Sequence, residues 1–167
     1  DRPNFFKNER VALIGASSDT SKVGYAIAKN SLTYGGDMFF VNSKGGELFG
    51  KKLYKGISEI DGDIDTAVIT IPSKFVLDTI KELISKKIKN VIIISAGFKE
   101  VGDYDSERII AELAKEHNFN VIGPNCLGYL EGSKNLNLTF GIGGLQRGDL
   151  ALLSQSGAVL SALMDKA

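Results

Sequence analysis

The chain has few of the residues that build disulfides, metal clusters or strongly charged surfaces. Its 167 residues include one cysteine and one histidine, and Lys plus Arg and Asp plus Glu each number 20. The single cysteine, Cys126, excludes an internal disulfide and leaves too few thiols for a zinc cluster, so no metal site is predicted. A net charge of zero provides no broad field for nucleic acid or an anionic membrane. Any anion must therefore be bound by a local arrangement of groups.

Long apolar segments are missing too. No apolar run approaches the length of a membrane span, and residues 1–9, DRPNFFKNE, lack the hydrophobic segment of a signal peptide. Hydrophobic residues make up 43% of the chain and charged residues 24%, as in ordinary soluble globular proteins. We therefore expect a cytoplasmic protein that has no membrane or nucleic-acid partner.

What the chain does contain is a series of short, apolar, β-branched runs, and these predict strands. The runs are Arg10–Ile14, Met38–Val41, Thr66–Ile71, Asn90–Ile94, Asn120–Ile122 and Leu150–Leu153. Near-continuous hydrophobicity is typical of strands covered on both faces of a parallel sheet. Apolar stripes at helical spacing lie between some of them, formed by Val76, Ile80, Leu83 and Ile84 and by Ile109, Ile110, Leu113 and Ala114. This alternation predicts an α/β fold with a Rossmann-like, doubly wound, mostly parallel sheet.

A glycine-rich segment late in the chain predicts a domain boundary. From Gly141 the sequence runs GIGGLQRGD, and LALLSQSGAVLSALMDKA then reads as a strand, a loop and a helix. One strand and one helix cannot form a domain. We therefore predict a first domain over residues 1–140, a linker over 141–148, and over 149–167 the incomplete start of a second, flavodoxin-like domain.

The loop after the first strand, GASSDTSKVG, has the composition of an anion site. In doubly wound sheets ligands bind beyond the carboxyl ends of the strands. Gly15 permits close approach of the backbone, the hydroxyls of Ser17 and Ser18 can donate, and Lys22 adds a positive charge just before a helix N-terminus. The alternative is a loop whose Ser or Asp merely caps the helix.

The end of the second strand narrows the choice of nucleotide. A sheet that binds NAD places Asp or Glu there for the ribose hydroxyls, whereas this strand ends in Val41 and Asn42 and continues into SKGG. A lysine at this point, Lys44, suits a phosphate on the ribose. NADP and coenzyme A both carry such a phosphate. The alternative is that Lys44 is an ordinary solvated lysine.

Two further loops contain residues with reactive or anion-binding side chains. Cys126, in GPNCLG, would need a base to act as a nucleophile, and we place the lone histidine, His117, at a helix C-terminus instead. We therefore interpret Cys126 as a small packing residue. The turn SQSGA is a second candidate for binding phosphate, through Ser154, Ser156 and Gly157.

Taken in order, several segments resemble one family, the α part of NDP-forming acyl-CoA synthetases. The segments are GASSDTSKVGYAIAKN, VNSKGGELFGKKLYKGISEI, ITIPSKFVLDTI, ISAGFKEVG, GPNCLG and LSQSGA. The pattern is most similar to ADP-forming acetyl-CoA synthetases and more distantly to the α subunit of succinyl-CoA synthetase, and it covers nearly the whole chain. The resemblance implies that the first domain binds coenzyme A. The implied contacts are Gly15, Ser17, Ser18, Lys22, Val23, Lys44, Ile71, Pro72, Ile94, Ser95, Ala96, Asn125 and Cys126.

The resemblance also implies a reaction for the complete enzyme. Acyl-CoA, a nucleoside diphosphate and phosphate would give the free acid, CoA and the nucleoside triphosphate, by way of an acyl phosphate and a phosphohistidine. Mg and the nucleotide would belong to the full enzyme, with a nucleotide-grasp β subunit or domain as partner. The sequence ends before the family's histidine, and His117 does not occupy its position. We therefore expect no catalytic residue in this chain, which should bind CoA without ligating it.

Other interpretations stay open at this point. The chain could be a stand-alone CoA- or nucleotide-binding regulatory module, although such a module would not need residues 149–167. It could be an NADP-binding oxidoreductase, although the G-x-G-x-x-G fingerprint and a hydride-site acid–base pair are missing. A similar part also occurs in related multidomain proteins that act as protein lysine acetyltransferases. The acyl group, the choice of ADP or GDP, and whether the chain forms a homo-oligomer are not fixed by the sequence.

Overall fold

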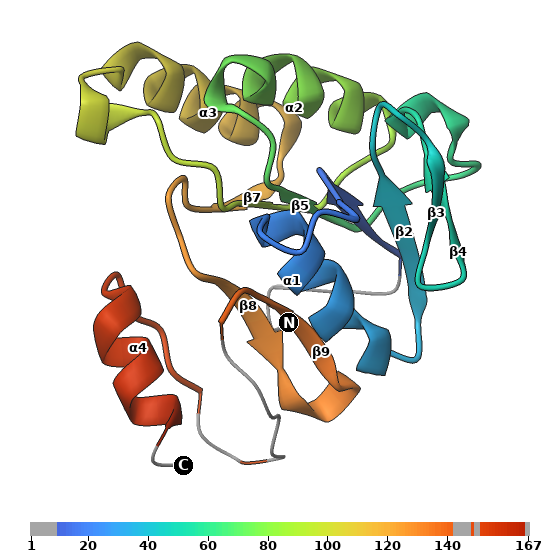
Figure 1. Ribbon diagram of the computed structural model, residues 1–167. Helices are drawn as coiled ribbons and strands as arrows, with labels where there is room; N and C mark the ends of the chain where they lie inside the picture. Colours follow the sequence, from blue (N-terminus) through green and yellow to red (C-terminus); the bar gives the residue numbers. More distant parts are fainter. Residues whose placement is uncertain (1–9, 142–147, 149–150, 166–167) are drawn as a thin grey trace.

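The computed structural model describes residues 10–141, 148 and 151–165. Its centre is a seven-stranded sheet in the order β3-β4-β2-β1-β5-β6-β7 (Figure 1). The strands are β1 (Arg10–Ile14), β2 (Asp37–Val41), β3 (Gly46–Leu48), β4 (Lys51–Tyr54), β5 (Thr66–Ile69), β6 (Asn90–Ile93) and β7 (Asn120–Ile122). All neighbouring pairs are parallel except β3 with β4. The predicted Rossmann-like sheet is confirmed.

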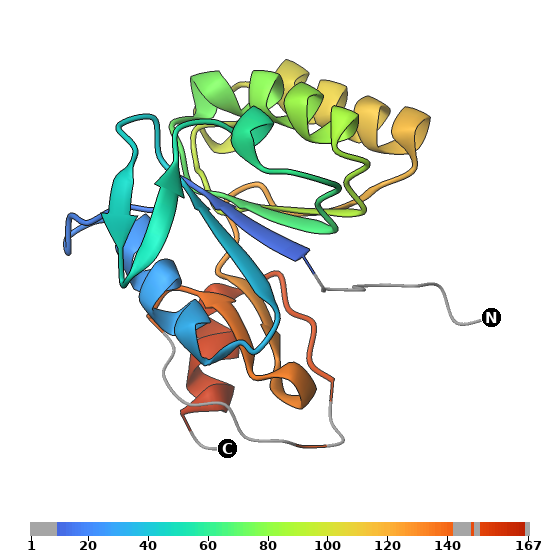
Figure 2. The same cartoon turned by 90° about the vertical axis from the view of Figure 1, so that its right-hand side faces the viewer.

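Different elements cover the two faces of this sheet, as Figure 2 shows edge-on. Helices α2 (Val76–Ser85) and α3 (Tyr104–His117) lie on one face. Helix α1 (Val23–Asn30) and a hairpin of β8 (Gly128–Glu131) and β9 (Leu136–Thr139) lie on the other. Because strand side chains alternate, Ala12 and Ile14 join the core under α2, whereas Leu13 joins the core under α1. Burial on both faces explains the continuous apolar runs.

The predicted helical stripes face this core. Val76, Ile80 and Leu83 of α2 are each fully buried, and Ile110 of α3 is 2% exposed. Helix α3 begins after Asp103, whose carboxylate accepts a hydrogen bond from the Ser106 backbone N–H at 3.0 Å. It ends at His117, as predicted, and Asn118 follows in a left-handed conformation with φ of 54°.

Two hairpins were not predicted from the sequence. The β3–β4 turn places Phe49 and Gly50 at φ of 52° and 73°, and β8 pairs antiparallel with β9. Leu136 and Leu138 of β9 are fully buried against the α1 face of the sheet. This hairpin therefore covers sheet area that a helix covers in an ideal doubly wound fold.

The predicted strand at Leu150–Leu153 is wrong where the structure describes it. Leu150 lies outside the described residues, and residues 151–153 form no strand. An isolated strand has no ladder partner, and no described strand pairs with this segment. The predicted helix after it does form, as α4 (Gly157–Met164), and its Val159 and Leu163 are about half exposed.

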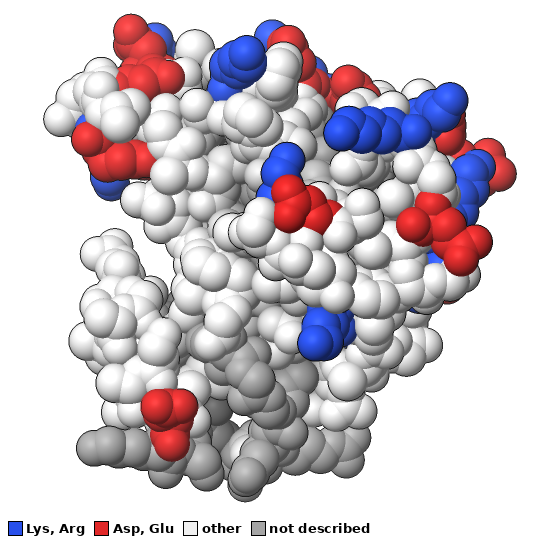
Figure 3. Space-filling model, in the orientation of Figure 1, with Lys and Arg blue, Asp and Glu red and all other residues white. Residues whose placement is uncertain are grey.

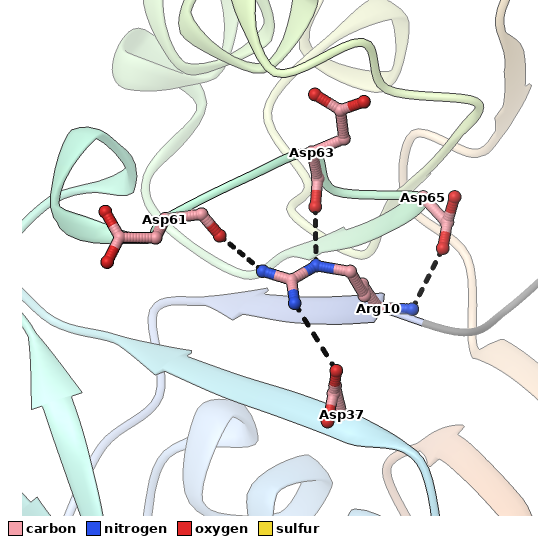
Figure 4. A network of polar contacts seen from close by, with 5 residues as sticks. All are labelled: Arg10, Asp37, Asp61, Asp63 and Asp65. Carbon is pink, nitrogen blue, oxygen red and sulfur yellow. Dashed lines mark hydrogen bonds and ion pairs between the residues drawn. The ribbon is translucent and has the colours of Figure 1, made fainter.

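The amino ends of the strands are held together by Arg10 (Figure 4). Its guanidinium donates to the backbone carbonyls of Asp61 and Asp63 and to the carboxylate of Asp37, the last at 3.4 Å. Its own backbone N–H donates to the Asp65 carboxylate at 3.0 Å. The connection into β5 is thereby fixed to β1 at the edge opposite the expected ligand side.

A polar ladder fixes the register of three neighbouring strands. Thr66, Asn90 and Asn120 occupy matching positions in β5, β6 and β7. The Asn90 side-chain amide donates to the Thr66 hydroxyl at 3.1 Å, and the Asn120 side-chain amide donates to the Asn90 side-chain oxygen at 3.0 Å. Because Thr66 and Asn90 are buried, a slip of either strand would leave polar atoms unpaired.

Candidate functional site

The order of the strands locates the candidate site. The chain runs outward from β1 to β2 and β4, then returns to place β5 on the other side of β1. Such a reversal opens a crevice beyond the carboxyl ends of the two central strands. The loops that follow β1 and β5 therefore flank it, with the loops after β2 and β6 beside them.

Glycines let the first loop and α1 pack unusually close to β1 and β5. Gly15 has φ of 101°, and a Cβ built on it would lie 2.3 Å from the Thr70 hydroxyl oxygen. A Cβ on Gly24 would lie 1.9 Å from the Gly15 carbonyl oxygen. The Thr70 hydroxyl lies within hydrogen-bond distance of the carbonyl oxygens of Ile14, at 3.0 Å, and Gly15. The N-terminus of α1 is thereby brought directly over the strand tip.

The polar side chains of this loop stabilise the loop and leave the helix uncapped. The Ser17 hydroxyl accepts from the Asp19 N–H at 3.1 Å, and Asp19 accepts from the N–H and hydroxyl of Ser21 at 2.9 and 2.7 Å. Helix α1 begins after Lys22, which makes no side-chain cap. The alternative that a Ser or Asp caps α1 is therefore wrong. The amides of its first residues, Val23 and Gly24, face the loop without a capping side chain.

Charged side chains of both signs lie beside this helix N-terminus. Hydrogen bonds from Ser21 are the main cause of a lowered pKa at Asp19, and the positive charges of Lys22 and Lys44 lower it further. Lys22 directly precedes α1, and Lys44 follows β2, whose end is joined to the first loop by the hydrogen bond from the Asn42 side-chain amide to the Ala16 carbonyl oxygen at 2.8 Å. An open helix N-terminus and lysines together form an arrangement that favours a phosphate group.

The loops after β5 and β6 form a less polar stretch of the same edge. Ile94 is buried, Ile71 and Ser95 are half-buried, and Pro72 and Ala96 are exposed. The Ser95 hydroxyl donates to the carbonyl oxygen of Ile71, which joins the two loops. These residues can line a groove, but the Ser95 hydroxyl is already engaged by the protein.

Asn125 and Cys126 lie next to that stretch. The Asn125 backbone N–H donates to the Ser95 carbonyl oxygen at 3.1 Å, so the loop after β7 is tied to the loop after β6. The Cys126 thiol donates to the Ile93 carbonyl oxygen at 3.3 Å, and burial raises the pKa of Cys126 to about 11. The thiol is protonated and engaged near neutral pH, which fits a packing residue rather than a nucleophile.

The turn before α4 differs from the turn before α1. Ser156 caps α4 by accepting from the Val159 N–H at 3.3 Å, and the Ser154 hydroxyl accepts from the Ser156 N–H at 3.0 Å. Among the described residues, the hydrogen bonds of 151–165 stay within that segment. Nothing therefore joins Ser154, Ser156 and Gly157 to the crevice, and a phosphate site there stays a prediction.

The face in Figure 3 shows basic and acidic side chains interspersed, with neither sign dominant. A pocket of about 250 Å³ at the opposite edge is lined by Ile84, Lys87, Ile88, Lys89 and His117. It lies at the C-terminal ends of α2 and α3, where helix dipoles disfavour anions. In the described ranges, no helix has the length and apolar character to cross a bilayer, and no cluster of side chains suits a metal ion.

Sequence reasoning missed three residues that build the site: Asn42, Thr70 and Gly24. The sequence showed Asn42 only as the residue at the end of β2, where a sheet that binds NAD has an acidic residue. Its amide donates to the Ala16 carbonyl oxygen at 2.8 Å, which joins the first two loops. Thr70 gave no signal, because a threonine at the end of an apolar run is ordinary in a strand.

The fold and this edge define a class: a Rossmann-like α/β domain whose crevice combines an open helix N-terminus with lysines. The family model described as "CoA binding domain" matches residues 9–131, and the chain belongs to that family.

Similar proteins are ADP-forming acyl-CoA synthetases. The chain is 46% identical over 155 residues to an ADP-forming acetate–CoA ligase of Methanocaldococcus jannaschii, covering 93% of this chain and 22% of the relative. It is 41% identical to the α subunit of ADP-forming acetate–CoA ligase II of Pyrococcus furiosus, covering 97% and 36%. The structure of acetyl-coenzyme A synthetase 1 of Ca. Korarchaeum cryptofilum, in complex with phosphate and ADP, has a TM-score of 0.91, 38% identity and coverage of 99% and 36%. The chain thus spans about a fifth to a third of these relatives.

Proposed function

We propose that this chain binds coenzyme A in the crevice beyond β1, β2, β5 and β6, as the CoA-binding part of an ADP-forming acyl-CoA synthetase. The observation that carries the proposal is the open N-terminus of α1 beside Lys22 and Lys44, within a chain of the CoA-binding family. These groups fit the phosphates of CoA, and the less polar loops after β5 and β6 fit its pantetheine arm.

In the proposed complex the nucleotide end lies against the first loop. Gly15 allows the backbone to approach, Ser17, Ser18 and the Val23 amide face the pyrophosphate, and Lys44 with Lys22 neutralises the ribose phosphate. The pantetheine arm passes the predicted contacts of the next two loops, which are Ile71, Pro72, Ile94, Ser95 and Ala96. Its thiol ends near Asn125 and Cys126, where the Cys126 thiol packs and takes no part in chemistry.

The proposed reaction belongs to a larger protein than this chain. Acyl-CoA, ADP and phosphate are converted to the acid, CoA and ATP, through an acyl phosphate and a phosphohistidine that this chain does not supply. A nucleotide-grasp subunit or domain, with Mg, supplies the nucleotide site. Residues 149–167 begin a second domain, and Ser154, Ser156 and Gly157 meet the phosphate there. We place this enzyme in the cytoplasm.

Calorimetric titration of the chain with CoA, NADP and NAD tests the binding proposal. CoA should bind more tightly than NAD, because NAD has no ribose phosphate for Lys44 to meet. It should bind more tightly than NADP, because NADP has no pantetheine arm to lie along the less polar loops after β5 and β6. At 100 times its dissociation constant CoA should stabilise the fold by about 2.7 kcal/mol, which a thermal shift detects. Tighter binding of NADP than of CoA, or a folded chain that does not bind CoA, would refute the proposal.

A measurement of enzymatic activity distinguishes the synthetase interpretation from that of a stand-alone binding module. The coding sequence beyond residue 167 should continue into a histidine-bearing domain. That extended protein is supplied with its nucleotide-grasp partner, ATP, CoA and short acids. Formation of acyl-CoA supports the synthetase, and CoA binding without any acyl-CoA supports the module.

A further inference from the structure

Asn42 makes hydrogen bonds with every polar group that it has. It follows β2 directly and is half-buried. Its backbone N–H donates to the Tyr54 carbonyl oxygen at 2.8 Å, and its own carbonyl oxygen accepts from the Gly45 N–H at 2.8 Å. Its side-chain amide donates to the Ala16 carbonyl oxygen at 2.8 Å, and its side-chain oxygen accepts from the Lys44 N–H at 2.9 Å.

The two side-chain bonds fix the loops that carry the lysines. The bond to Lys44 closes a turn in which an Asx side chain replaces a backbone acceptor, and it sets the direction in which residue 44 leaves the strand. The bond to Ala16 ties the same side chain to the first loop, next to the buried Ser17. Asn42 thus links Lys44 to the first loop, at Ala16.

We propose that Asn42 is the positioning residue that holds Lys44 against the first loop, and that it thereby sets the preference for a ribose carrying a phosphate. This inference rests on the proposed CoA site. An acid at this place would keep the acceptor for the Lys44 N–H but lose the donor to Ala16. It would also turn a negative charge toward the bound phosphate, as suits a ribose with free hydroxyls instead.

The test compares CoA with dephospho-CoA, which lacks the ribose phosphate, in calorimetric titrations of Asn42→Asp. The variant should lose about tenfold in affinity for CoA and much less for dephospho-CoA, because one charge-assisted contact is misplaced and a like charge is added. Asn30→Asp is the matched control. It removes an Asn amide bond to a backbone carbonyl, that of Thr139 at 2.9 Å, at the far end of α1, and should leave the preference unchanged.

A double-mutant comparison separates positioning from a general loss of structure. In the Lys44→Ala background, Asn42→Ala, which adds no charge, should change the ratio of the two affinities little further, because the group that Asn42 positions is gone. Additive losses, or an Asn42→Asp variant with the ratio of the native chain, would overturn the inference while leaving CoA binding intact. If the native chain binds neither ligand, the proposed function itself fails and the inference falls with it. If Asn42→Asp does not fold, Asn42→Ala, which adds no charge, is judged by the same ratio.

Discussion

Replacing Gly24 by alanine tests whether close packing of α1 on β1 shapes the site. A Cβ at residue 24 would lie 1.9 Å from the Gly15 carbonyl oxygen and 2.9 Å from its carbonyl carbon. Real Cβ atoms essentially never approach closer than 3.0 Å, so α1 must retreat by about 1 Å. The obstructing atoms are backbone and cannot rotate away. Retreat would also loosen Ile27 and Ala28, which are fully buried.

Gly24→Ala changes the free energy of unfolding in two opposite ways, through helix propensity and through packing. Alanine is favoured over glycine in a helix by up to about 1 kcal/mol, and Gly24 does not have the positive φ that would forbid alanine. Overpacking costs about 1–3 kcal/mol, and here the contact is with backbone. We therefore expect Gly24→Ala to lower the free energy of unfolding by about 1–2 kcal/mol, measured by urea denaturation with circular dichroism. Gly35→Ala, where a Cβ would meet nothing within 4 Å, is the control and should change it by less than about 0.5 kcal/mol. A Gly24→Ala variant as stable as the native chain would refute the packing argument.

Three further outcomes follow from named contacts. Arg10→Met should lower the free energy of unfolding in urea by about 1–2 kcal/mol, since it removes the donors to Asp37, Asp61 and Asp63. Arg10→Lys should recover little of this stability, because lysine lacks the planar guanidinium. An unchanged free energy of unfolding in Arg10→Met would contradict this. Cys126 should react with a disulfide reagent at pH 8 on the order of 100-fold more slowly than a small thiol, because burial raises its pKa to about 11. The reaction should become faster as the pH approaches that value. Rapid reaction of the folded chain at pH 8 would contradict the raised pKa. His117 should carry no acid-labile phosphate after incubation with acetyl phosphate, as judged by mass spectrometry, because it lies at the C-terminus of α3, away from the crevice.

The parallel strands were predictable because burial on both faces leaves a continuous apolar run. Arg10–Ile14 and Asn120–Ile122 match the predicted bounds, and β5 and β6 end one or two residues earlier than predicted. The β3–β4 hairpin was not predicted, because edge strand β3 and its neighbour β4 are short and β4 begins with two exposed lysines, Lys51 and Lys52. Their turn uses Phe49 in a left-handed conformation, where Asn or Gly is the usual signal. The run at Leu150–Leu153 has the composition of a strand, but composition supplies no ladder partner.

The candidate site also has parts that the sequence indicates and parts that it does not. Gly15, Lys22 and Lys44 were proposed from the sequence because their residue types suit an anion and each follows a strand, and their contacts with CoA stay a prediction. The links between loops were not, since each joins residues far apart in the chain, such as Asn42 with Ala16 and Ser95 with Ile71. The uncapped start of α1 was also hidden, because a loop rich in Ser and Asp usually supplies a cap, and here Asp19 binds Ser21 instead.

Amide chemical-shift mapping of the ¹⁵N-labelled chain during titration with CoA tests the central claim most directly. The account predicts that the largest shifts fall on the amides of Ser17, Ser18, Val23 and Lys44, with smaller ones at Ser95 and Asn125. Dephospho-CoA should reproduce this pattern except at Lys44 and its neighbours. Shifts that cluster instead around Lys87, Lys89 and His117, at the opposite edge of the sheet, would contradict it.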